Sequence, residues 1–163
     1  MLKLYKKLKL IIYDFDGIMT NNKVLIDVFN NEYVQVNRSD GLAISEIKKM
    51  NIDQIIISSE KNNLVKSRAK KLNIKCFNNV DNKKIVLQKY CKKNKIDLSS
   101  VMYLGNDIND LMAMSIVGYK FCPKDSSKEI IKISDKVLKS KGGDGVIREL
   151  FDYLKNGGAN NDN

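Results

Sequence analysis

Two aspartates, Asp14 and Asp16, stand one residue apart at the end of an apolar run and directly before a glycine, in LKLIIYDFDG (residues 8–17). An apolar run of this length that ends at a turn signal is typical of a buried β-strand. Ligands of open parallel sheets bind beyond the carboxyl ends of the strands. Two carboxylates so close repel each other unless a cation or a shared proton relieves them. Because Mg²⁺ takes oxygen ligands, usually one or two carboxylates with substrate phosphate, the pair indicates a site for a hard cation.

Three further polar positions lie where strands end or helices begin. Ser58 ends the apolar run DQIII, Lys83 lies near the start of a helical pattern, and GNDIND (105–110) follows another apolar run. Each has an ordinary explanation as well, because Ser, Asp and Asn cap helices and Lys83 is one of 29 basic residues. Right-handed crossovers between parallel strands would gather the strand ends on one rim.

The elements that would position these residues alternate between strands and helices, which argues for a parallel α/β sheet. We expect further strands at 53–58, 74–77, 101–104, 117–120 and 137–138. We expect helices from Ser39 or Asp40 to about 50, and at 62–72, 82–93, 111–114, 126–133 and 145–154. Loose alternation between 23 and 37 predicts a hairpin that follows the first strand.

The 163 residues suit one domain, which we expect to span 1–154, with an Asn- and Gly-rich disordered tail at 155–163. Three widely spaced cysteines indicate reduced thiols, and the absence of histidine excludes His-based acid–base chemistry and His-ligated metals. No apolar stretch is long enough for a membrane span, and no signal peptide is recognisable, so we expect a cytoplasmic protein without membrane contact.

The net charge of +10 is carried mostly by lysines. A basic patch for nucleic acid is one interpretation. A solvated lysine-rich surface is the other, and we favour it because the lysines are scattered. We therefore expect no nucleic-acid partner, and a cationic surface that attracts a small acidic sugar phosphate.

The segment DFDGIMT (14–20) resembles motif I of the haloacid dehalogenase (HAD) superfamily, and Ser58, Lys83 and GNDIND resemble its motifs II, III and IV. The resemblance spans about residues 7–151. It implies a Rossmann-like three-layer α/β/α fold with a small β-hairpin flap and no large cap. It also implies that Asp14 is the nucleophile that forms an aspartyl-phosphate and that Asp16 is the general acid and base. Ser58 would then hydrogen-bond the phosphoryl group, and Lys83 would neutralise its charge.

The fourth motif departs from the superfamily pattern, because Asn106 stands where an acidic residue normally coordinates Mg²⁺. An amide oxygen still ligates Mg²⁺, but the site loses one negative charge. The implied metal ligands are Asp14, Asp16 and either Asn106 or Asp107, with Asp110 as a further ligand or supporting candidate.

The predicted flap, RSDG (38–41) and GGDGVIRE (142–149) resemble the 3-deoxy-manno-octulosonate 8-phosphate phosphatase family, which includes the N-acylneuraminate and 2-keto-3-deoxynononate 9-phosphate phosphatases. Its members are typically homotetramers whose subunits complete one another's sites, so the resemblance implies a homotetramer. Glu60, where octulosonate phosphatases typically have arginine, resembles the nine-carbon branch together with Arg68 and Lys71. Arg68 and Lys71 share a helix face. They would hold the substrate carboxylate, or form a solvated basic face.

The resemblance predicts a Mg²⁺-dependent phosphatase acting on a phosphorylated 3-deoxy-ulosonic acid, with nine-carbon substrates favoured over the eight-carbon one. The alternative is a non-catalytic or weakly active oligomerisation module, related to the C-terminal domain of sialic-acid cytidylyltransferases (CMP-sialate synthetases). The neutral side chain of Asn106 fits that alternative as well.

Overall fold

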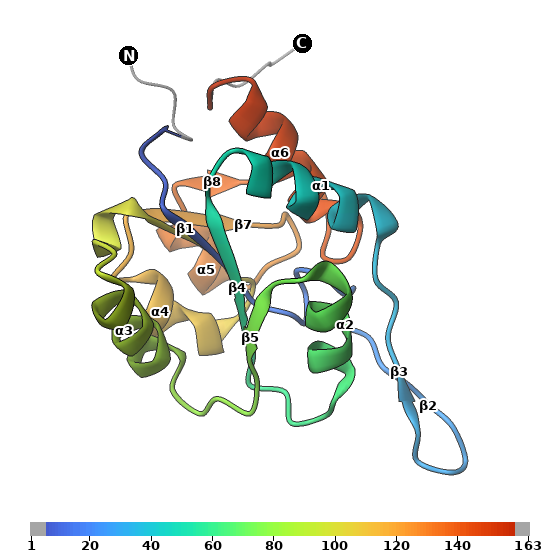
Figure 1. The fold of residues 1–163 in the computed structure, drawn as a ribbon. Coiled ribbons are helices and arrows are strands. Elements are labelled where there is room, and N and C mark those ends of the chain that lie inside the picture. Colours follow the sequence, from blue (N-terminus) through green and yellow to red (C-terminus); the bar gives the residue numbers. More distant parts are fainter. Residues whose placement is uncertain (1–5, 159–163) are drawn as a thin grey trace.

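The computed structural model describes residues 6–158. Its centre is a six-stranded, all-parallel sheet with the strand order β5-β4-β1-β6-β7-β8 (Figure 1). The strands are β1 (Leu10–Tyr13), β4 (Asp53–Ile57), β5 (Lys75–Phe77), β6 (Val101–Leu104), β7 (Tyr119–Cys122) and β8 (Lys136–Val137). The order changes direction at β1, so the carboxyl end of β1 is where the fold is expected to bind a ligand.

Helices cover both faces of the sheet, which gives the predicted three layers. One face carries α1 (Arg38–Lys49), α2 (Leu64–Leu72) and α6 (Val146–Lys155). The other carries α3 (Lys83–Asn94), α4 (Leu111–Met114) and α5 (Lys128–Ile133). Short 3-10 helices, η2 (Leu98–Ser100) and η3 (Ile108–Asp110), flank β6.

Alternation along β1 divides the core into two apolar clusters. Ile11 and Tyr13 pack with α1, α2 and α6, whereas Leu10 and Ile12 pack with α3, α4 and α5. Every residue of β1 is completely buried. A strand buried on both faces is apolar throughout, and this burial makes β1 a rigid support for the residues that follow it.

Most predicted bounds differ from the structure by one or two residues, and at two positions the physical reason is plain. The N-cap of α1 is Asn37, whose side chain accepts a hydrogen bond from the backbone N–H of Ser39, so neither Ser39 nor Asp40 caps this helix. The strand expected at 117–120 lies at 119–122, because Gly118 belongs to a turn whose backbone lies directly against Ser99.

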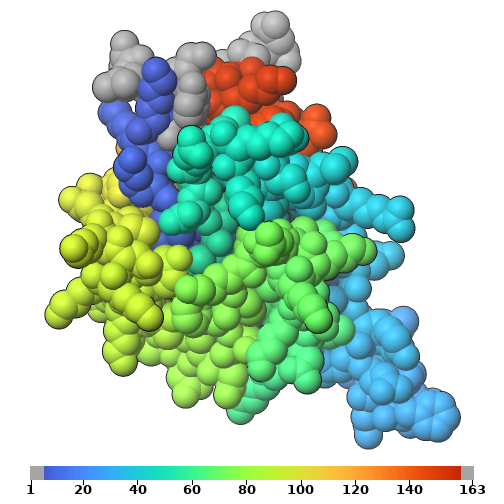
Figure 2. Space-filling model, viewed as in Figure 1, coloured from blue at the N-terminus to red at the C-terminus, as the bar shows by residue number. Residues whose placement is uncertain are grey.

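The hairpin that follows β1 is shorter than the 23–37 segment suggests, with β2 (Leu25–Ile26) antiparallel to β3 (Glu32–Tyr33). It projects from the body as a flap and is light blue in Figure 2. Its apolar side chains are uncovered, with Val28 91% and Phe29 81% exposed.

The cysteines, the end of the domain and the character of the helices can also be compared with the expectations. Cys91 and Cys122 are buried, Cys76 is half-buried, and all three are free thiols. Helix α6 continues to Lys155, one residue past the expected domain end, while 159–163 of the expected tail lie outside the described residues. Within residues 6–158, no helix combines the length and apolar character that a bilayer crossing requires.

Candidate active site

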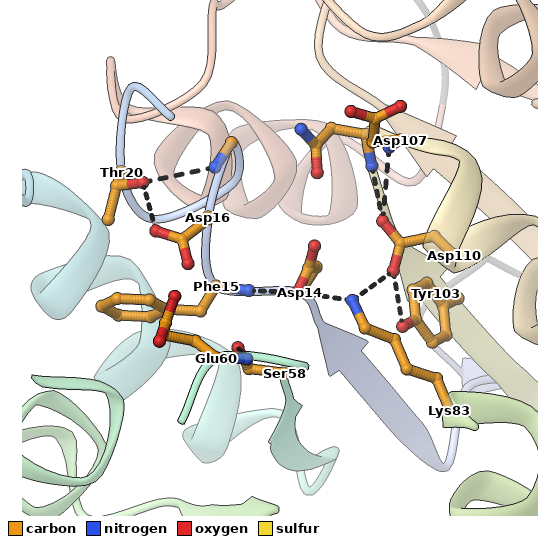
Figure 3. Close-up of polar contacts among 12 residues, drawn as sticks. Asp14, Phe15, Asp16, Thr20, Ser58, Glu60, Lys83, Tyr103, Asp107 and Asp110 are labelled. Atoms are coloured by element: carbon orange, nitrogen blue, oxygen red, sulfur yellow. Dashed lines mark hydrogen bonds and ion pairs between the residues drawn. The ribbon is translucent and has the colours of Figure 1, made fainter. Parts of the chain in front are cut away.

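Asp14 leaves the sheet at the carboxyl end of β1 and turns its side chain into the protein. Its backbone N–H still bonds the carbonyl of Leu104 on β6, at 2.9 Å. Its Oδ1 accepts a hydrogen bond from the Phe15 N–H at 2.8 Å and lies 2.7 Å from the ammonium of Lys83 (Figure 3). Both contacts fall on the same oxygen.

Lys83 joins Asp14 to the fourth motif. This first residue of α3 is 2% exposed, and its Nζ lies 2.7 Å from Oδ1 of Asp110 as well as from Asp14. Asp110 is completely buried and also accepts hydrogen bonds from the Tyr103 hydroxyl and the Asn106 backbone N–H, at 2.9 and 3.0 Å. Every oxygen of this buried carboxylate therefore has a donor, as burial of a charge requires.

Tyr103 was not foreseen as part of the site. In the sequence it is one more apolar residue of the strand that precedes GNDIND. A buried tyrosine needs a partner for its hydroxyl, and its position just before an Asp-rich loop was the signal available.

Burial or neighbouring charges raise the pKa values of Asp14, Asp16 and Lys83. Burial and the neighbouring Asp110 raise the pKa of Asp14 to about 8, against the opposing effect of Lys83. Burial works to lower the pKa of Lys83, but Asp14 and Asp110 outweigh it, so that pKa is raised and Lys83 stays protonated. Burial also raises the pKa of Asp16, although the Thr20 hydroxyl opposes the rise. Asp14 and Asp110 thus share one ammonium, and Asp16 adds a further carboxylate to the site, an imbalance that a divalent cation would relieve.

Asp16 is held by the tight turn that follows β1. Its Oδ1 accepts a hydrogen bond from the Thr20 hydroxyl at 3.0 Å, and Thr20 in turn accepts one from the Gly17 N–H at 3.3 Å. Gly17 has a φ of +81°, and a Cβ at this position would overlap the side-chain amide of Asn106. The turn therefore needs glycine both for its backbone conformation and for the close approach of Asn106.

Asn106 carries a buried side-chain oxygen without a partner. The residue is 8% exposed, and no hydrogen-bond donor reaches its Oδ1. A cavity of about 150 Å³ lies beside it; its lining residues are Asp14, Asp16, Asn22, Asn106, Asp107, Ile108 and Asn109. Unpaired buried polar atoms require a cause, and a cation between this amide and the two aspartates would supply one.

The oxygen donors fit Mg²⁺. Across residues 6–158 there is no cluster of three or more His, Cys, Asp or Glu that could hold a metal. Two carboxylates and one amide oxygen remain a suitable set for Mg²⁺, which is usually bound through one or two carboxylates with waters and substrate phosphate. The replacement of a carboxylate by Asn106 is the reason that acidic clustering alone does not reveal the site.

Asp107, the other predicted third ligand, lines the same cavity but is exposed and serves as the N-cap of η3. Its Oδ1 accepts a hydrogen bond from the Ile108 N–H at 2.8 Å. Of the two candidates, Asn106 is the one with a free buried oxygen.

Ser58 follows β4, the parallel neighbour of β1, so it reaches the same rim as Asp14. It is 1% exposed, and its Oγ accepts a hydrogen bond from the Glu60 N–H at 3.1 Å. Its hydroxyl hydrogen remains able to donate toward a phosphoryl oxygen.

The three predicted substrate-binding residues differ in their surroundings. The Glu60 carboxylate accepts hydrogen bonds from two backbone N–H groups and lies near enough to raise the pKa of Asp16. Arg68 is half-buried and donates to the Asn37 carbonyl at 2.9 Å, while Lys71 is exposed. The structure brings Glu60 to the site but turns Arg68 toward α1, and their shared role remains a prediction.

Known proteins resemble this chain along nearly its whole length. The model of the haloacid dehalogenase-like hydrolase family matches residues 1–150. The 3-deoxy-D-manno-octulosonate 8-phosphate phosphatases of Salmonella typhi and Escherichia coli K12 are each 29% identical over 150 residues, which cover 91% of this chain and 80% of each relative.

Solved structures give the same result. A Streptomyces avermitilis MA-4680 protein assigned to the HAD family of hydrolases has 34% identity and a TM-score of 0.90, and the match covers 94% of this chain and 88% of that one. The 3-deoxy-D-manno-octulosonate 8-phosphate phosphatase of Moraxella catarrhalis, in complex with a magnesium ion, a phosphate ion and a KDO molecule, has 28% identity and a TM-score of 0.89, and the match covers 94% of this chain and 91% of that one. The chain therefore belongs to the haloacid dehalogenase-like hydrolases, and it is a phosphatase of that family.

Proposed function

We propose that this phosphatase hydrolyses the phosphate monoester of a 3-deoxy-ulosonic acid and requires Mg²⁺. The observation that carries the proposal is the buried Asp14–Lys83–Asp110 chain beside a small cavity that the unpartnered oxygen of Asn106 lines. The substrate class named for the Salmonella and Escherichia relatives and the magnesium in the Moraxella structure support it.

Asp14 would act as the nucleophile. Lys83 and the Phe15 N–H both hold its Oδ1, which leaves Oδ2 to attack phosphorus. A bond forms between this oxygen and phosphorus while the bond from phosphorus to the sugar oxygen breaks. Asp16 gives its proton to the leaving oxygen, and the burial that raises the pKa of Asp16 favours that role. The same carboxylate then takes a proton from the water that hydrolyses the aspartyl-phosphate.

The remaining residues stabilise charge. Lys83 and Ser58 would hold the phosphoryl oxygens, an arrangement that acts mainly through positioned charge in phosphoryl transfer. Asp14, Asp16 and Asn106 would hold Mg²⁺, which supplies neutralisation of the phosphoryl charge when bound.

Asn106→Asp should tighten metal binding, because it restores a third carboxylate to the set. We expect the Mg²⁺ concentration for half-maximal activity to fall about tenfold, since ligand charge tunes the affinity of such sites. The rise in Tm with added Mg²⁺ should move to the same lower range. Asn109→Asp, which alters another asparagine of the cavity lining, is the matched control. Equal Mg²⁺ dependence of the two variants would argue against Asn106 as a ligand.

The substrate class is tested by phosphate release across eight- and nine-carbon 3-deoxy-ulosonic acid phosphates, with and without Mg²⁺. We expect kcat/KM to be about tenfold higher for the nine-carbon esters, because one matched contact to a charged group, here that of Glu60, is worth about 1.5 kcal/mol. Glu60→Arg, which introduces the residue typical of octulosonate phosphatases, should remove that preference. Hydrolysis of simple esters without hydrolysis of either acidic class would leave the phosphatase assignment intact and reject the proposed substrate.

The second candidate function is a weakly active oligomerisation module. The neutral side chain of Asn106 and the exposed apolar residues of the flap favour it. We propose that the chain forms a homotetramer in which another copy covers the exposed Val28 and Phe29 side chains. Light scattering of the wild type and of Val28→Asp gives the assembly size. A tetramer without phosphate release at saturating Mg²⁺ would favour the module over the enzyme.

A further inference from the structure

Helix α6 begins without a cap of its own. Its N-cap residue is Gly145, which has a φ of +83° and no side chain to accept a hydrogen bond. The first N–H groups of a helix need acceptors. Asp40 of α1 supplies them from more than a hundred positions away, because its Oδ1 accepts from the Ile147 and Arg148 N–H groups at 3.0 and 2.9 Å.

Asp40 is unusual for a helix-capping residue, because only 2% of it is exposed. Its other oxygen, Oδ2, is buried without a hydrogen-bond partner. Burial raises the pKa of Asp40 to about 6, against its hydrogen bonds with the α6 N–H groups. The charged groups around it are Arg68 on α2 and Asp144 before α6, with the Tyr13 hydroxyl on β1.

The segment that Asp40 thereby anchors, residues 142–145, lies against the turn that carries Asp16. The Gly143 N–H donates to the Ile18 carbonyl at 3.0 Å. A Cβ on Gly142 would overlap the Gly17 carbonyl, and one on Gly143 would lie within 2.5 Å of the Thr20–Asn21 backbone. The two backbones are thus in direct contact, and neither can shift without the other.

We propose that Asp40 is a positioning residue for the general acid: by capping α6 it holds 142–145 against the Gly17–Thr20 turn and so fixes Asp16. The contacts form an unbroken path. Asp40 holds the start of α6, Gly143 holds Ile18, and Thr20 holds the Asp16 carboxylate at 3.0 Å. This inference rests on the proposed role of Asp16 but not on the identity of the sugar.

A displaced general acid has a kinetic signature that general loss of structure lacks. A p-nitrophenolate leaving group needs little protonation, whereas an alkoxide needs a proton from Asp16. Misplacement by about 1 Å costs up to 10²-fold in rate. Asp40→Ala should therefore lower kcat/KM by about 10²-fold for glycerol 3-phosphate and by less than about fivefold for p-nitrophenyl phosphate.

Two further variants test the path itself. Gly143→Ala, which disturbs the contact with the turn and leaves the α6 cap in place, should give the same unequal loss. Asp40→Asn keeps an oxygen that accepts from both N–H groups, so it should restore kcat/KM to within about threefold of the wild type. Asp97→Ala removes the cap of η2 at the opposite end of the sheet, so it should leave kcat/KM unchanged for both esters.

The possible outcomes distinguish a failure of this inference from a failure of the proposed function. Hydrolysis of neither ester by the wild type would reject the phosphatase mechanism. With an active wild type, an equal loss on both esters, or full activity of Gly143→Ala, would overturn the role of Asp40. If Asp40→Ala does not fold, Gly143→Ala and Asp40→Asn still decide the question, because Gly143→Ala must show the unequal loss and Asp40→Asn must not.

Discussion

Asp14→Asn is expected to lower kcat/KM by about four orders of magnitude or more, the usual effect of removing a covalent nucleophile. An amide oxygen cannot form the aspartyl-phosphate, so the covalent step is lost. The fold should survive, because asparagine keeps an oxygen for the Phe15 N–H and Lys83 keeps its ion pair with Asp110. Phosphate release under single-turnover conditions measures the loss, and circular dichroism verifies the fold.

Asp53→Asn is the matched control for this substitution. Asp53 begins β4, at the end of the sheet opposite the site, and is exposed. Its replacement should leave kcat/KM within about twofold of the wild type, as is usual for surface changes. If Asp14→Asn kept more than a hundredth of the wild-type activity, Asp14 would not be the nucleophile.

Lys83→Met is expected to remove activity and to destabilise the fold together. The substitution leaves Asp14 and Asp110 facing each other in a buried space without the ammonium that lies 2.7 Å from both. Removing one partner of a buried ion pair costs about 3–5 kcal/mol of unfolding free energy. Urea unfolding measures this change, and kcat/KM should fall by about 10³-fold as the phosphoryl charge loses its counter-charge.

The stability loss of Lys83→Met should depend on pH. Without the ammonium, the folded-state pKa of Asp14 rises further above its unfolded value of about 4. The folded variant then binds protons that the unfolded chain releases, so its stability rises as pH falls from 8 toward 5. Lys84→Met, one position along the helix and only half-buried, should show neither effect. A pH-independent loss would mean that packing, not charge, accounts for the change.

The sequence by itself determined the fold class and the chain positions where chemistry is possible. Apolar runs such as that of β1 predict buried strands because a strand covered on both faces has no polar side. The segment 101–104 was predicted at its observed bounds for this reason. The order of four motifs along the alternating elements predicted the family, which the match over residues 1–150 confirms.

Only the tertiary structure decided how these positions meet. The sequence alone does not show that Tyr103 and Lys83 both contact Asp110, because they lie 7 and 27 positions from it along the chain. It could not separate Asn106 from Asp107, because the difference is a free buried oxygen against one that caps η3. Asp40 looked like a cap for its own helix, yet it caps α6, 107 residues away. Local patterns report local hydrogen bonds and burial, whereas long-range partners depend on how the layers pack.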